Sequence, residues 1–203
     1  MPMAPTHDVI TLISAAALAP PLYLALSLTD PVLAIAGTAL FISAHLVSGL
    51  LFSPDLDLDS AIDDRWGIFY WIWRPYMWVV PHRNFWSHSL VFAPLLRLCY
   101  FYVVLVGILI VCAVGLQSVG IAIPPYHRQL GRALLNAAQI YPREVRLLLL
   151  GFVTGSAAHS IADWLVTSGK HLLRRVGIRV RRNYANHDRY IPRRGRRSAW
   201  PSI

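Results

Sequence analysis

Residues 145–167 read VRLLLLGFVTGSAAHSIADWLVT, a run long and apolar enough to cross a membrane as a helix, yet it contains His159 and Asp163. These two residues are four positions apart, so a helix places both on one face. An ionisable side chain is costly inside a membrane and indicates a functional site whose partners come from elsewhere in the chain. Small residues in the same run, Gly151 and Gly155 among them, favour close packing against another helix.

The whole chain has the composition of a membrane protein. Of its 203 residues, 56% are apolar and only 14% are charged, whereas about a quarter of the residues in a soluble domain are charged. Three further segments are long and apolar enough to span: 9–29, 31–52 and 89–116. The first has no basic residues before it, which favours a retained span over a signal peptide. We therefore expect an all-α fold, an integral membrane bundle of about four transmembrane helices, with residues 1–169 as its membrane-embedded domain.

A polar and aromatic segment, residues 53–88, separates the second and third expected spans. It contains Trp66, Trp71, Trp73 and Trp78. Tryptophan favours the boundary between membrane and water. We expect this segment to lie at the interface as a short amphipathic helix or a re-entrant piece.

The basic residues are concentrated towards the end of the chain. The net charge is +9, no Lys or Arg precedes Arg65, and residues 170–203 contain Lys170 and ten arginines against one acid, Asp188. Four spans would put the N-terminus, the 53–88 segment and this tail on one side, which the excess of basic residues predicts to be cytoplasmic. We expect the tail, residues 170–203, to bind anionic lipid headgroups. Nucleic acid is not an expected partner, because the chain has no motif for it.

Candidate metal ligands from four separate segments fall on that same predicted side. They are His7, His45, Asp55, Asp57, His82, His88, His159 and Asp163, with Asp59 as a further carboxylate. His127 falls in the opposite connection, residues 118–144, and is excluded. Imidazoles combined with carboxylates suit zinc best, with manganese or iron as alternatives, rather than calcium. A bound divalent cation would also neutralise carboxylates that burial otherwise disfavours.

Several of these residues also have simpler interpretations. His45 could be hydrogen-bonded to a neighbour, and the His159/Asp163 spacing occurs by chance. The acidic stretch SPDLDLDS, residues 53–60, is not an EF-hand, because Ser60 and Trp66 stand where glycine and glutamate are required. A hydrogen-bonded polar seam that joins the four helices is an alternative to a metal site.

The chain resembles an uncharacterised bacterial family of metal-binding membrane proteins, similar to the YdjM-type membrane-bound metal-dependent hydrolases. The resemblance rests on SPDLDLDS, on RWG and RPY, on PHRNFWSHS with Arg97 downstream, and on HSIADW, and it covers about residues 5–167. It implies that the metal or catalytic residues are Asp55, Asp57, His82, His88, His159 and Asp163, with His7 and His45 joining them. It also implies a multi-pass protein of the bacterial inner membrane, and the distribution of basic residues predicts that site and tail are cytoplasmic.

The predicted function is metal-dependent hydrolysis of a phosphoester or lipid headgroup. A divalent ion can activate water and polarise the scissile group. Asp57 or Asp59 would serve as general base, and Arg83 would hold a substrate phosphate. A non-catalytic structural or sensing metal site is the alternative function. Transport is less favoured, because the first and third expected spans carry few polar residues.

Overall fold

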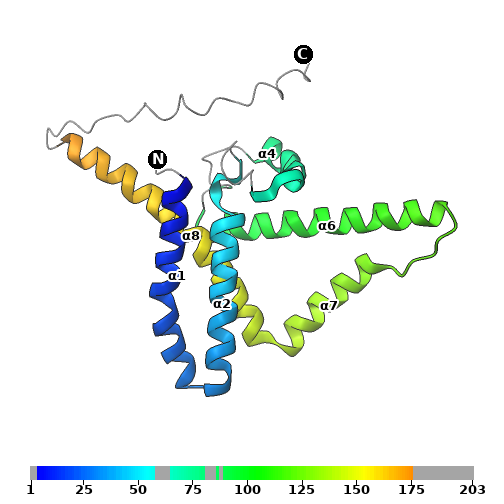
Figure 1. Ribbon diagram of the computed structural model, residues 1–203, viewed down its shortest axis with the longest axis horizontal. Coiled ribbons are helices and arrows are strands. Elements are labelled where there is room, and N and C mark those ends of the chain that lie inside the picture. Colours follow the sequence, from blue (N-terminus) through cyan, green and yellow to red (C-terminus); the bar gives the residue numbers. More distant parts are fainter. Residues whose placement is uncertain (1–3, 58–64, 81–85, 87–88, 176–203) are drawn as a thin grey trace, which may run out of the picture. The chain divides into compact units, whose positions relative to one another are not determined.

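The computed structural model describes residues 4–57, 65–80, 86 and 89–175, and every regular element in these ranges is a helix. In chain order the elements are α1 (Ala4–Ser27), α2 (Pro31–Leu51), η1 (Pro54–Asp57), η2 (Gly67–Trp73), α4 (Arg74–Val79), α6 (Phe92–Ser118), α7 (Tyr126–Ile140) and α8 (Pro142–Arg175). Figure 1 shows their arrangement. The predicted all-α fold is confirmed for the described residues.

Four helices are long and apolar enough to cross a membrane. The qualifying stretches are Thr6–Ser27, Pro31–Leu51, Phe92–Ser118 and Pro142–Val166. They match the four expected segments to within a few residues at each end. None of the residues in the most apolar part of α6 is buried within the protein, so this helix has a large apolar surface that only a surrounding apolar medium or a partner could cover.

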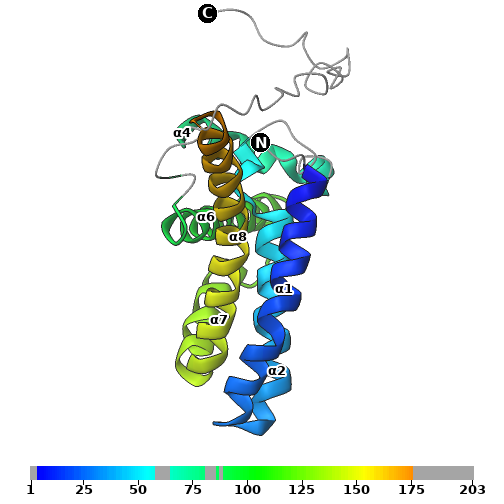
Figure 2. The ribbon, with the colours of Figure 1, turned by 90° about the vertical axis from the view of Figure 1, so that its left-hand side faces the viewer.

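Helices α1 and α2 form an antiparallel pair that runs side by side in both ribbon views (Figures 1 and 2). The turn between them ends at Asp30, whose Oδ1 accepts a hydrogen bond from the backbone N–H of Leu33 at 3.0 Å. Asp30 is therefore the N-cap of α2, and Pro31 follows at the first helical position, where its missing N–H costs nothing.

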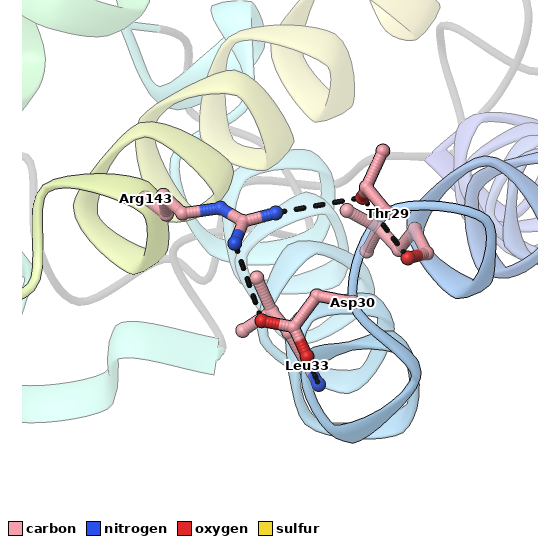
Figure 3. Close-up of polar contacts among 5 residues, drawn as sticks. Thr29, Asp30, Leu33 and Arg143 are labelled. Carbon is pink, nitrogen blue, oxygen red and sulfur yellow. Dashed lines mark hydrogen bonds and ion pairs between the residues drawn. The ribbon is translucent and has the colours of Figure 1, made fainter.

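The first turn of α8 is joined to the α1–α2 turn. One terminal nitrogen of Arg143 donates to Asp30 Oδ2 at 3.2 Å, and the other lies 3.5 Å from Thr29 Oγ1 (Figure 3). All of these side chains are exposed or half-buried. We call Thr29, Asp30 and Arg143 the turn end of the bundle.

Helices α2 and α8 approach so closely that glycine is required between them. A Cβ on Gly151 would lie 2.2 Å from the carbonyl oxygen of Phe41, and one on Gly155 would lie 2.1 Å from that of His45. No side chain fits at such distances. The predicted role of the small residues in 145–167 is thereby confirmed for these two glycines, which are one turn apart on the same face.

Aromatic rings form the largest packed cluster, where α2 ends. Phe52 has the rings of Trp66, Trp73, Phe101 and Phe152 at 5.3–5.5 Å between centroids, in edge-to-face contact. These residues come from the end of α2, the 65–80 segment, α6 and α8. The cluster therefore joins three helices to the segment that we expected at the interface.

The 65–80 segment forms two short helices, η2 and α4, with two different faces. Tyr70, Trp73 and Tyr76 are buried against the aromatic cluster, whereas Trp71 and Trp78 are exposed. The expected amphipathic character is present, but half of the aromatic surface packs on the protein itself.

The connection 118–144 contains a helix, α7, where the sequence analysis treated it only as a link between spans. Its polar side chains, Arg128 and Arg132 among them, share one face, and large apolar residues such as Leu134 and Ile140 share another and are exposed. None of its residues is buried. A helix that contributes nothing to the packed interior gives no long apolar run from which to predict it.

The chain divides into two units, residues 1–166 and 167–203. In the second unit the structure describes residues 167–175, the end of α8. The predicted basic tail otherwise lies outside the described residues, and the boundary predicted at 169/170 stays a prediction.

Candidate metal centre

His7 lies in the first turns of α1 and is almost fully buried, with 4% of its surface exposed. The hydroxyl of Thr11 donates to its carbonyl oxygen at 2.9 Å. Thr11 in turn lies against Gly49 near the end of α2, where a Cβ would be 2.4 Å from a Thr11 methyl group. These contacts fix the start of α1 against the end of α2 and place the His7 ring inside the bundle.

His159 and Asp163 enter the same region from α8. His159 is 1% exposed and the Asp163 side chain 13%. The distance from His159 Nε2 to Asp163 Oδ2 is 3.8 Å, so the prediction that this i,i+4 pair shares one helix face is confirmed.

The three side chains meet as one cluster, which we call the His–Asp cluster: His7, His159 and Asp163. His7 Nε2 lies 3.4 Å from Asp163 Oδ1, and the two imidazole rings stack with their centroids 3.7 Å apart. One ligand atom from each residue lies within 4.8 Å of the other two. Within the part of the chain that the structure describes, this is the one group of three His, Cys, Asp or Glu residues with that geometry.

The spacing and chemistry of the His–Asp cluster fit a divalent metal ion. Ligands of a tetrahedral zinc ion with bonds of about 2.1 Å lie about 3.4 Å apart, close to the distances from Asp163 to the two imidazoles. Nitrogen and carboxylate ligands also suit manganese and iron. Because the ring planes are only 15° apart and the centroids 3.7 Å apart, the lone pairs of the two rings lie in separate, nearly parallel planes. Coordination of one ion by both rings would require the planes to open.

The Asp163 carboxylate lacks the compensation that a buried charge needs. Both of its oxygens are inaccessible, and neither accepts a hydrogen bond from any residue that the structure describes. The basic groups that the structure places beside it are the two imidazoles, at 3.4 and 3.8 Å, beyond the usual hydrogen-bond range of about 2.7–3.2 Å. A buried carboxylate is expected to be hydrogen-bonded, paired with a cation or bound to a metal.

His45 does not join the His–Asp cluster. Its Nε2 lies 2.9 Å from the hydroxyl of Ser14 on α1, and its Nδ1 lies 3.0 Å from the hydroxyl of Thr154 on α8. The ring is fully buried and links three helices. For this residue the geometry is that of the hydrogen-bonded alternative.

The other predicted site residues are placed only in part. Asp55 and Asp57 lie in η1, directly after α2, but their side chains fall outside what the structure describes. Asp59, His82, Arg83 and His88 lie outside the described residues altogether. Their assignments as ligands, general base and phosphate-binding group stay predictions. His127 lies on α7.

Two basic side chains near the site were not assigned a role from the sequence. Arg65 pairs with Asp8, the residue after His7, and the fully buried Arg97 donates to the carbonyl oxygen of Phe52 at the end of α2. The one available signal was a basic residue within an otherwise apolar span, since Arg97 lies among the apolar residues of 89–116.

The sequence profile of a family described as uncharacterized metal-binding protein (DUF2227) matches residues 2–173. The chain belongs to this family. The matched range contains all three residues of the His–Asp cluster. No curated protein and no solved structure matches the chain.

Proposed function

We propose that this member of the metal-binding family holds a divalent ion, zinc in the first place, through His7, His159 and Asp163 at one end of a membrane-embedded helical bundle. The observation that carries the proposal is the Asp163 carboxylate, which is buried between two imidazoles without a hydrogen bond from the described residues. A divalent cation offsets the carboxylate and uses the imidazoles as ligands in the same step.

An ion pair between the residues themselves explains the cluster less well. A protonated imidazole that pairs with a carboxylate forms a short charge-assisted hydrogen bond, about 2.7–2.9 Å long. The distances from Asp163 to the two imidazoles, 3.4 and 3.8 Å, are longer. Two ligands of one zinc ion lie about 3.4 Å apart, which is closer to these distances.

The exposed apolar surface supports a membrane location. Val103, Val111 and Val114 of α6 are among many large apolar side chains exposed along the four apolar helices. A contiguous apolar surface of this extent is unfavourable in water and favourable in lipid. The basic tail supports a cytoplasmic orientation by its charge.

We further propose that the site hydrolyses a phosphoester or a lipid headgroup. A bound ion would supply Lewis-acid activation of water and of the scissile group. Of the chain's own residues, Asp57 or Asp59 would accept the proton of the attacking water, and Arg83 would bind the phosphate. The exposed Trp71 and Trp78 of the segment that follows α2 would keep the protein in contact with lipid substrate.

A structural or sensing metal site is the second candidate. It is favoured by burial: the ligands are only 1–13% exposed, and an ion bound to them would join α1 to α8. A closed coordination shell of protein ligands stabilises a fold without chemistry, whereas catalysis requires an open position.

Metal analysis of the full-length protein, purified in mild detergent, tests the proposal. We expect about one ion per chain, lost in the Asp163→Asn and His159→Ala variants and kept in His127→Ala, which changes a histidine on α7. Equal metal content in all four proteins would refute the His–Asp cluster as the site. If the ion is present, a screen of phosphodiester and phospholipid substrates separates the two functions. Hydrolysis that a chelator abolishes favours the enzyme. A metal-loaded protein that hydrolyses none of these substrates favours the structural site.

A further inference from the structure

The C-terminal end of α2 is capped by side chains from other parts of the chain. The last carbonyl groups of a helix have no partner within it, and Ser48 provides the last acceptor used inside α2, at its bond with the N–H of Phe52. Three of the carbonyls that follow accept from side chains: Leu50 from Arg65 at 2.6 Å, Leu51 from Trp66 at 2.9 Å, and Phe52 from Arg97 at 2.9 Å. We call Arg65, Trp66 and Arg97 the collar.

Both arginines of the collar also contact the helices that carry the proposed ligands. Arg65 forms an ion pair with Asp8, next to His7 on α1. Arg97 donates to the hydroxyl of Ser156 at 3.1 Å, and Ser156 lies one turn before His159 on α8. Each arginine therefore bridges the end of α2 to a helix that supplies a member of the His–Asp cluster.

The charge of the collar matches the charge at this place in the chain. The C-terminus of a helix is the negative end of its dipole, where cations are favourable and carboxylates are not. The sequence nevertheless puts Asp55, Asp57 and Asp59 directly after α2. Two guanidinium groups at that end offset the helix dipole, and Arg97 does so while only 1% exposed.

We propose that Arg65 and Arg97 are positioning residues of the metal site. They hold α1 and α8 against the end of α2, so that His7 meets the His159/Asp163 pair. Asp55, Asp57 and Asp59 follow α2 in the sequence. The inference rests on the proposed metal binding and goes beyond it, because it assigns a role in metal affinity to two residues outside the His–Asp cluster.

Zinc titration of the full-length protein in detergent tests this role. Residues that hydrogen-bond a metal ligand directly typically contribute about 10–100-fold to affinity. Because Arg97 and Arg65 act on the helices that carry the ligands, we expect Arg97→Gln and Arg65→Gln each to weaken zinc binding by a factor at the lower end of that range, about tenfold. Arg143→Gln is the matched control, because Arg143 pairs with Asp30 at the turn end, and it should bind zinc within about twofold of the wild type.

Two conservative variants separate positioning from general stability. Ser156→Ala removes one acceptor of Arg97 and should weaken zinc binding by a smaller factor, about threefold, while the metal-free protein loses no more stability than one buried hydrogen bond contributes, about 1–3 kcal/mol. Arg97→Lys should restore part of the affinity, because it keeps the charge but loses the geometry of the guanidinium. The visible spectrum of bound Co²⁺ should change in Arg97→Gln, since the ligands would be arranged differently.

Wild-type zinc affinity in folded Arg97→Gln and Arg65→Gln would overturn the inference. If Arg97→Gln does not fold, unchanged affinity in both Ser156→Ala and Arg97→Lys overturns it instead. A wild-type protein that binds no zinc, manganese or iron overturns the proposed function, and this inference with it. A wild-type protein whose affinity depends on His159 but not on the collar overturns this inference alone.

Discussion

Asp30 and Asp163 are two aspartates in different regions of one bundle, and their surroundings differ. At the turn end, Asp30 accepts from the Leu33 N–H with one oxygen and pairs with Arg143 through the other. Its side chain is 36% exposed. In the His–Asp cluster, Asp163 is 13% exposed, and both oxygens lack a hydrogen bond from the described part of the chain.

The two carboxylates differ in the basic groups that lie beside them. The exposed carboxylate of Asp30 pairs with an arginine and accepts from a backbone N–H, so the protein itself compensates its charge. The buried one has two imidazoles at ligand distances and no guanidinium or ammonium among the contacts that the structure gives it. Arg143 pairs with the exposed acid, whereas the basic groups that the structure places beside the buried acid are histidines. Imidazole and carboxylate groups together are typical ligands of a transition metal.

Helix α8 carries both Arg143 and the His159/Asp163 pair, so both regions depend on its close approach to α2. Gly155→Ala would place a Cβ 2.1 Å from the His45 carbonyl oxygen, so we expect a loss of about 3 kcal/mol or more in the free energy of unfolding. Gly107→Ala is the matched control, because nothing lies within 4 Å of a Cβ there. Thermal unfolding in detergent measures both, and equal melting temperatures would contradict the close approach.

The second prediction tests the two acids directly through metal removal. An ion at a hundred times its dissociation constant stabilises the protein that binds it by about 2.7 kcal/mol. Chelation should therefore lower the melting temperature of the wild type and of Asp30→Asn, but not that of Asp163→Asn. Equal sensitivity of the two variants to chelator would remove the distinction between the two regions.

In the metal-free protein, Asp163→Asn should change the stability in the opposite direction. Without an ion, neither oxygen of the buried Asp163 carboxylate accepts a hydrogen bond from the described residues, so Asp163→Asn should raise the free energy of unfolding by about 1 kcal/mol in excess chelator. The same change at Asp30 should be neutral or destabilising, because Arg143 loses its ion pair. Chemical denaturation of the two variants in chelator provides the check, and destabilisation by Asp163→Asn would argue for an internal hydrogen-bonded role instead.

The smallest effects are expected at the turn end. Arg143→Gln breaks an exposed ion pair and should cost about 0.5 kcal/mol or less, whereas Asp30→Ala also removes the N-cap and should cost about 1 kcal/mol. Neither should change metal content. A loss from Arg143→Gln as large as that from Asp30→Ala would show that the ion pair, and not the cap, is the main contribution of this region.

Much of the fold could be predicted, because its signals are local in sequence. Apolar runs predicted the four long helices, the spacing of His159 and Asp163 predicted their common face, and Gly151 and Gly155 predicted the close packing of α8. What failed was α7, since an amphipathic helix without buried residues resembles a polar connection.

The site could be predicted only as a set of candidates, because its members come from distant segments. Nothing in the sequence distinguishes His7, which meets Asp163 of α8, from His45, which contacts the hydroxyls of Ser14 and Thr154. The choice depends on how α1, α2 and α8 are rotated about their axes. That rotation is set by contacts such as Thr11 against Gly49, which involve residues far apart in the chain.

X-ray absorption spectroscopy of the zinc-loaded full-length protein identifies which histidines bind the ion. The scattering signature of imidazole should correspond to at least two histidine ligands in the wild type and in His45→Gln, and to one fewer in His7→Ala. A zinc environment that is unchanged in His7→Ala, or one that loses an imidazole in His45→Gln instead, would contradict the assignment of the metal to His7, His159 and Asp163.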